Sequence, residues 1–333
     1  MALAVFSGEK KGLRPMPIKI PDDLPARQFL ETEGLLVMGE SDALRQDVRP
    51  LRIALLNLMP QKIKTETQLA RLIGSTPLQV ELTLLITSSY TPTTVPKQHL
   101  LDFYRPWDEV RSEKFDGLII TGAPIEKMPF DEVVYWRELT EILDWSQTNI
   151  HQSYNLCWGA QAALYHFYGI PKHTMPAKLF GVFKHHITTP NSTVLRGFND
   201  EFFVPVSRHT ETRREDLLPY SGLEILAESE EAGLCLIQDH DHRHLYMFNH
   251  LEYDAGTLRD EFNRDLSAGL DIQPPKYYFP NDDPEREPRN FWRSHAHLLM
   301  GNWINDLYQT TPYDLNDIGS KKPVTLLVES KSA

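Results

Sequence analysis

NIHQSYNLCWGAQAALYHFYG, residues 149–169, decides the fold that this sequence predicts. A strand-like run ends at Cys157, and a helix-like run rich in small residues follows until Gly169 and Pro171 stop it. A strand that turns sharply into a helix presents the residue at the turn on the carboxyl edge of a parallel sheet. The segment therefore predicts an α/β fold with a cysteine on a nucleophile elbow.

Strands and helices alternate on the N-terminal side of this segment. Short apolar runs predict strands over residues 51–59, 79–87 and 115–124, and helical spacing predicts helices over 62–74 and 131–147. Such alternation is typical of a mostly parallel sheet with helices on both faces. The predicted fold class is therefore α/β, with the elbow at the carboxyl edge of a mostly parallel sheet flanked by helices.

The C-terminal half is richer in short strands. Strands are expected over 179–188, 201–207, 223–229, 233–239 and 243–250, and helices over 255–269 and 294–308. No internal repeat is visible, so a single α/β domain over residues 16–314 fits better than two domains. We interpret residues 1–15 as an N-terminal extension and residues 315–333 as a loosely ordered C-terminal tail.

Composition and charge exclude several classes of protein. The 333 residues carry 34 basic and 46 acidic side chains, and the net charge of −12 argues against nucleic acid or an anionic membrane as the main partner. No apolar run approaches the ~18–20 residues of a membrane span, and the first residues lack the features of a secretory signal. Two cysteines cannot form a disulfide framework or a four-thiolate zinc site. We therefore expect a soluble, reduced, cytoplasmic protein.

Cys157 is the first candidate catalytic residue. The N-terminus of the following helix favours a thiolate and offers backbone N–H groups, including that of Trp158, to an oxyanion. The alternative is a buried cysteine that packs as a small apolar residue, which is our interpretation of Cys235 within an apolar strand. Asn155 departs from the usual elbow, because a small residue is common two positions before the nucleophile.

A cysteine nucleophile needs a base and a group that orients the base. His250 and Glu252 stand at the end of the strand predicted over 243–250, and alternation places them on the same side of an extended segment. A lone histidine at a strand end is more often an ordinary loop residue, so this interpretation depends on Cys157. The loop TGAP, residues 121–124, ends another predicted strand, and its backbone N–H groups are placed to complete an oxyanion hole.

Thirteen histidines raise metal binding as an alternative. His185 and His186 point to opposite faces of a predicted strand, and His295 and His297, two apart on a predicted helix, cannot chelate one ion together. The sequence contains no HExxH, no zinc-type Cys/His spacing and no Gly-rich nucleotide motif. We therefore predict no metal site and no tightly bound cofactor.

Several long stretches resemble the homoserine O-acyltransferases of methionine biosynthesis, a glutamine-amidotransferase-like family whose members use acetyl-CoA or succinyl-CoA. The resemblance runs from Met16 to Leu315 and is carried by residues 48–85, DGLIITGAPIE (116–126), CWGAQAALYHFYGIPK (157–172), 224–233, HLEYDAGTLRDEFNRD (250–265) and 278–284. It implies a class I glutamine-amidotransferase-like (flavodoxin-like) fold and a single acyltransferase domain over 16–314. Leu251 departs from the family, which commonly reads His-Pro-Glu.

The family's site residues carry over by motif. The resemblance implies that Cys157 is the acyl-accepting nucleophile, His250 the proton acceptor and Glu252 the acid that orients it. It also implies three substrate-binding residues, Lys178, Ser207 and Arg264. A lysine and an arginine suit the carboxylate or phosphate ends of the substrates, although on their own they would be interpreted as solvated surface charges.

The acyl donor is expected from Glu126. In the family a glutamate at this position goes with acetyl-CoA, because its charge repels and its side chain crowds the terminal carboxylate of a succinyl group. We therefore expect acetyl transfer from the co-substrate acetyl-CoA to the hydroxyl of L-homoserine through a ping-pong acyl-cysteine mechanism. The expected partners are these small molecules, and a homodimer is left open.

Other functions remain open from the sequence. A succinyltransferase shares everything except the Glu126 argument, and serine differs from homoserine by one methylene, which a pocket discriminates by only ~1–3 kcal/mol. A hydrolase or a glutamine amidotransferase can use the same cysteine, histidine and glutamate but releases ammonia or a hydrolysed product and not coenzyme A. A non-catalytic binding module on this fold is the alternative from a different class.

Overall fold

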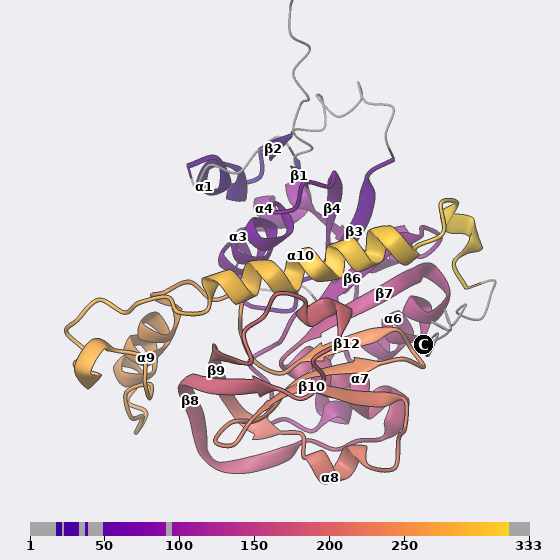
Figure 1. Cartoon of the computed structure of the whole chain (residues 1–333). Coiled ribbons are helices and arrows are strands. Elements are labelled where there is room, and N and C mark those ends of the chain that lie inside the picture. The colour runs from indigo at the N-terminus through magenta and orange to yellow at the C-terminus, as the bar shows by residue number, and fades with distance from the viewer. Residues whose placement is uncertain (1–17, 22, 33–36, 39–48, 91–94, 320–333) are drawn as a thin grey trace, which may run out of the picture.

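One mixed sheet runs through the protein, whose computed structural model describes residues 18–21, 23–32, 37–38, 49–90 and 95–319 (Figure 1). Its strands follow the order β2-β1-β4-β3-β6-β7-β12-β11-β10-β8-β9, and β5 pairs with β4. The strands are β1 (Ile18–Lys19), β2 (Val37–Met38), β3 (Leu51–Leu56), β4 (Val80–Ile86), β5 (Tyr104–Pro106), β6 (Phe115–Ile120), β7 (Ile150–Leu156), β8 (His173–Ile187), β9 (Glu201–Glu211), β10 (Leu223–Ser229), β11 (Gly233–Asp239) and β12 (His244–Met247).

The sheet changes from parallel to antiparallel at β12. From β2 through β4, β3, β6 and β7 to β12 every pairing is parallel, whereas β12, β11, β10, β8 and β9 pair antiparallel. The predicted α/β fold with a mostly parallel sheet and a strand-rich C-terminal half is confirmed. As a result, the carboxyl ends of β6, β7 and β12 meet at one edge.

Helices cover both faces of the sheet, because alternate side chains of β3 (Leu51–Leu56) pack into two different cores. Ile53 and Leu55 belong to an apolar core with α3 and α10, while Ala54 and Leu56 belong to a second core with α6 and α7. Helix α10 crosses the first face in Figure 1. The helices are α1 (Ala26–Thr32), α3 (Lys62–Ile73), α4 (Lys97–Phe103), α5 (Trp107–Val110), α6 (Trp136–Asn149), α7 (Trp158–Tyr168), α8 (Arg214–Leu217), α9 (Thr257–Ser267) and α10 (Arg293–Thr310).

The helix after the elbow ends where the sequence predicts, whereas two strands beside the elbow end earlier, and the first of these, β6, ends at Ile120 and not at residue 124. Helix α7 stops at Gly169, whose φ of 67° is left-handed and whose N–H donates to the carbonyl of Tyr165. Strand β12, however, ends at Met247 and not at residue 250 as predicted. Met247 pairs with Leu156, the last residue of β7, so the parallel ladder has no partner beyond it.

The tail that we predicted to be loose from residue 315 onward is held at its start. Ile318 is only 4% exposed, and the ammonium of Lys114 donates to the carbonyls of Ile318 at 2.6 Å and of Asn316 at 3.2 Å. The remainder of that tail, residues 320–333, and the predicted N-terminal extension, residues 1–15, lie outside the described residues.

Candidate active site

The elbow places Cys157 in a strained conformation between β7 and α7. Its φ of 49° and ψ of −115° lie in a region that L-residues rarely adopt, and such a conformation costs about 1–3 kcal/mol. Its N–H donates to the carbonyl of Met247 at 2.7 Å, while its carbonyl accepts from Ala160 and Gln161 in the first turn of α7. Both the neighbouring strand and the helix therefore hold the strained residue in place.

Two glycines allow the loop after β6 to lie against the elbow. A Cβ added to Gly159 would stand 2.7 Å from the carbonyl oxygen of Thr121 and 3.0 Å from that of Ile120. A Cβ added to Gly122 would stand 3.2 Å from Cβ of Cys157. The loop 121–124 thus lies beside Cys157, as the sequence predicts, and only residues without a side chain permit this approach.

His250 and Glu252 meet as predicted, although in a turn and not in an extended strand. The chain leaves β12 after Met247, and the N–H of His250 donates to the carbonyl of Pro205. Nδ1 of His250 lies 2.7 Å from Oε1 of Glu252, and both side chains are buried. The ring of Tyr253 stacks on the imidazole at 4.2 Å between centroids and 11° between planes.

The charges around His250 favour its protonated form. Burial alone would lower the pKa of His250, but the charges of Glu252 and Cys157, with hydrogen bonds to both side chains, raise it well above its usual value. Nδ1 of His250 faces the carboxylate of Glu252, and His250 and Cys157 line the same cavity, as a base oriented by an acid requires.

Two further predictions from the sequence concern Trp158, which follows the elbow, and Cys235, which was expected in the core. Trp158 opens α7, so its N–H has no acceptor within the helix, and its buried ring packs against Phe130 and Tyr135. Cys235 is 1% exposed, and burial raises the pKa of its thiol to about 12. Cys235 is therefore a core residue, as predicted.

A cavity of about 630 Å³ opens above Cys157 at this edge of the sheet. Its walls come from the N-terminal half of α3, the loop after β6, the turn after β12, strands β8 and β9, and helix α9. It brings together seven predicted site residues from six parts of the chain, namely Glu126, Cys157, Lys178, Ser207, His250, Glu252 and Arg264.

Two acidic residues that the sequence reasoning missed organise the substrate-binding positions. Lys178 donates to Glu261 at 2.7 Å and to Asp265 at 2.9 Å, and the hydroxyl of Ser207 donates to the same Glu261 oxygen at 2.7 Å. The guanidinium of Arg264 donates twice to Asp265. The signal was present in the sequence, since residues 261, 264 and 265 share one face of the helix predicted over 255–269.

The cluster formed by Lys178, Arg264, Glu261 and Asp265 places positive and negative side chains together at the cavity wall. Burial alone would raise the pKa of Asp265, but hydrogen bonds from Lys178 and Arg264 lower it below its usual value. Lys178 is only 10% exposed, whereas the Arg264 side chain is 61% exposed. A small zwitterion would meet anionic and cationic groups here together.

Two other kinds of site are absent from the described residues. No group of three or more His, Cys, Asp and Glu side chains within residues 18–319, leaving aside the undescribed gaps, is arranged to hold a metal ion. None of the helices in the same part of the chain is long and apolar enough to cross a membrane.

The architecture and the cavity define a class of protein, an α/β enzyme with its reactive groups at the carboxyl edge of parallel strands. Comparison with known sequences narrows the class to acyltransferases. Residues 17–313 match the sequence profile of homoserine O-succinyltransferase, and the chain belongs to that family.

Curated relatives of this chain are named as acetyltransferases, whereas the family profile is named for succinyl transfer. The chain is 59% identical to a homoserine O-acetyltransferase of Hyphomonas neptunium, covering 91% of this chain and all of the relative. It is 58% identical to one of Rhizorhabdus wittichii, with 92% and 96% covered, and 56% identical to one of Brucella canis, with 91% and 99% covered.

Two solved structures that are similar to this chain at low identity are named as glutamine amidotransferases. One from Methylobacillus flagellatus is 14% identical, with 78% of this chain and 95% of that chain covered and a TM-score of 0.47. One from Thermotoga maritima is 11% identical, with 79% and 98% covered and a TM-score of 0.45.

Proposed function

We propose that this chain is a homoserine O-acetyltransferase, which transfers the acetyl group of acetyl-CoA to the hydroxyl of L-homoserine in methionine biosynthesis. The observation that carries the proposal is that Cys157, His250 and Glu252 line one cavity of about 630 Å³, in which Nδ1 of His250 lies 2.7 Å from Oε1 of Glu252. The names of relatives at 56–59% identity over nine-tenths of the chain support the same activity.

In the first half-reaction the Cys157 thiolate attacks the thioester carbonyl of acetyl-CoA. The carbonyl electrons move to oxygen, where the N–H of Trp158 and the backbone of the loop 121–124 are placed to stabilise the oxyanion. Collapse of this intermediate expels the CoA thiolate, which takes a proton from the His250 imidazolium. The products are CoA thiol and an acetyl-cysteine.

In the second half-reaction His250 removes the proton from the hydroxyl of homoserine as the oxygen attacks the acetyl-cysteine. Glu252 stabilises the imidazolium that forms, because its carboxylate lies 2.7 Å from Nδ1. Cys157 leaves as a thiolate paired with His250, and O-acetylhomoserine departs. No step requires a metal or a resident cofactor.

The charged cluster suits the amino-acid end of the acceptor. Homoserine carries an ammonium and a carboxylate, and the cavity wall offers Glu261 and Asp265 for the first and the exposed Arg264 for the second. Lys178 and Ser207 hold Glu261 in position through their hydrogen bonds. Serine is the second candidate acceptor, since it carries the same charged groups on a chain one methylene shorter.

Glu126 supports acetyl-CoA over succinyl-CoA as the donor. It lines the same cavity as Cys157, in the loop that follows β6. A succinyl group ends in a carboxylate, and a second negative charge beside Glu126 would be repelled in a partly enclosed cavity. An acetyl group carries no charge and needs little room.

The test is a matrix of CoA-release assays. Acetyl-CoA and succinyl-CoA are each offered with homoserine, serine or no acceptor, and free thiol is measured over time. The proposal expects the highest kcat/KM for acetyl-CoA with homoserine and little thiol release without an acceptor beyond one equivalent per enzyme. Preference for succinyl-CoA, for serine or for water would replace it with the corresponding alternative.

Two further parts of the proposal concern the setting of the enzyme. We propose that the enzyme acts in the cytoplasm, where acetyl-CoA and amino-acid biosynthesis are found. We also propose a homodimer, which the sequence leaves open, as its oligomeric state. Light scattering of the purified chain tests the second point directly.

A further inference from the structure

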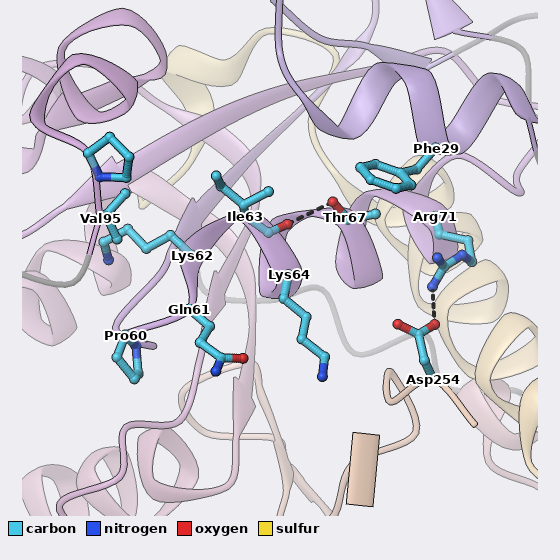
Figure 2. A pocket seen from close by; sticks show the side chains of 11 residues that line it. Phe29, Pro60, Gln61, Lys62, Ile63, Lys64, Thr67, Arg71, Val95 and Asp254 are labelled. Carbon is cyan, nitrogen blue, oxygen red and sulfur yellow. Dashed lines mark hydrogen bonds and ion pairs between the residues drawn. The ribbon is translucent and has the colours of Figure 1, made fainter. Parts of the chain in front are cut away.

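A groove of about 460 Å³ lies next to the catalytic cavity, on the outer face of the N-terminal half of α3. Pro60, Gln61 and Lys64 line both spaces, so the groove adjoins the cavity along these three residues. Figure 2 shows Val95 and Phe29 at opposite ends of the groove, with Lys64 extending between Gln61 and Asp254. Nothing in the proposed chemistry at Cys157 uses this groove.

Two cationic side chains, those of Lys64 and Arg71, line the groove. Lys62 lines it as well, but its ammonium is buried and donates to the carbonyl of Asn57, and Asp254 supplies the one carboxylate of the lining. Asp254 is already neutralised, because it accepts from Arg71 at 2.7 Å and from Gln68 at 3.1 Å. Lys64 is paired with Asp260 at 2.9 Å, but the two side chains are 31% and 60% exposed, so a phosphate can compete for the ammonium.

Most of the remaining lining residues are apolar, and they include an exposed aromatic ring. Phe29 is 56% exposed on α1, and its ring stands over the groove beside Thr67 and Arg71 (Figure 2). Pro60, Ile63 and Val95 complete the apolar wall. Bases stack on such rings, and phosphates pair with neighbouring lysines.

We propose that this groove binds the pantetheine arm and the adenine nucleotide end of the acyl donor, with the adenine on Phe29 and a phosphate at Lys64. The inference rests on the proposed use of acyl-CoA at Cys157. A thioester at the end of a long arm must reach the sulfur while its nucleotide lies elsewhere. On the α9 wall of the cavity Glu261 and Asp265 are already paired with Lys178 and Arg264, whereas the α3 wall leads past Lys64 into the groove.

The test compares two donors on wild type, Phe29→Ala and Lys64→Gln. Acetyl-CoA carries the nucleotide, whereas S-acetyl-N-acetylcysteamine has the same thioester and ends before it. Each variant is expected to lower the ratio of kcat/KM for acetyl-CoA over the small donor about tenfold, the order of one base–aromatic stack or one charged contact. A ratio equal to that of wild type in both variants overturns the proposal.

Matched controls are available outside the groove. Leu101→Ala removes an apolar side chain that is 78% exposed on α4, and Lys184→Gln removes a lysine that is 57% exposed and paired with Glu201. Neither residue lines the groove or the cavity, so both variants should keep the wild-type ratio. A loss in the controls as large as in the groove variants would also contradict the proposal.

A binding measurement separates this inference from the proposed function. Calorimetric titration of free CoA should give a dissociation constant about tenfold weaker for Phe29→Ala and Lys64→Gln than for wild type. If wild type transfers acetyl from both donors but the variants bind CoA normally, the groove assignment fails and the acetyltransferase stands. If wild type uses neither donor, the acetyltransferase fails, and the CoA titration alone decides the groove.

Discussion

Gly159→Ala should damage catalysis far more than a single methyl group suggests. The new Cβ would stand 2.7 Å from the carbonyl oxygen of Thr121 and 3.0 Å from that of Ile120, both backbone atoms that cannot rotate away. To reach an ordinary contact of 3.4 Å, the start of α7 has to move from β6 by about 0.7 Å. Overpacking of this kind costs about 1–3 kcal/mol of folding free energy.

The same displacement moves Cys157, which lies two residues before Gly159. A misplacement of about 1 Å at a reacting group costs on the order of 10²-fold in rate, so we expect kcat/KM with acetyl-CoA and homoserine to fall about 10- to 100-fold. Urea unfolding, measured on the same preparation, gives the stability change separately. The rate is compared only at temperatures where the variant is fully folded.

Gly301→Ala is the matched control. Gly301 lies inside α10, and a Cβ there meets no atom within 4 Å. Alanine is favoured over glycine in a helix by about 0.5–1 kcal/mol, so this variant should be slightly more stable and fully active. A Gly159→Ala enzyme with wild-type kcat/KM and stability would show that the elbow does not need the close approach of α7 to β6.

Three further predictions concern the reacting groups. Cys157→Ala should abolish CoA release, and mass spectrometry of wild type with acetyl-CoA alone should find one acetyl group on Cys157 and none on the buried Cys235; an acetyl group on another residue would refute the covalent mechanism. Glu252→Gln removes a charge that raises the pKa of His250. The rise with pH of kcat/KM for homoserine should therefore move to lower pH while the maximum rate falls. A shift to higher pH would contradict the pairing of His250 with Glu252. Glu126→Gly should raise the kcat/KM ratio of succinyl-CoA to acetyl-CoA tenfold or more, about 1.4 kcal/mol, and an unchanged ratio would remove Glu126 as the donor-selecting residue.

The central part of the fold could be predicted from the sequence because its signals are local. The residues of β7, the small residues of α7 and the stop at Gly169 are contiguous, so each element carries its own pattern. The predictions missed the short elements, such as α4 with 7 residues and α8 with 4. Such helices have too few turns to show a periodic apolar face.

The site was predictable in its residues but not in its contacts. His250 and Glu252 do meet, although the prediction of an extended segment was wrong, because the ladder with β7 has no partner after Leu156. The bonds from Lys178 to Glu261 and Asp265 join residues 83 and 87 positions apart. Only the packing of α9 against the sheet brings them together, and no local pattern encodes it.

The hydrogen bond from Cys157 N–H to the carbonyl of Met247 has a consequence for amide hydrogen exchange. This proton joins the carboxyl ends of β7 and β12, the strands after which Cys157 and His250 follow, so it reaches solvent only when β7 and β12 separate. We expect it to exchange as slowly as the most protected amides of the central strands. On heating, loss of activity and cooperative loss of the sheet should then follow one time course, with no folded but inactive species between them.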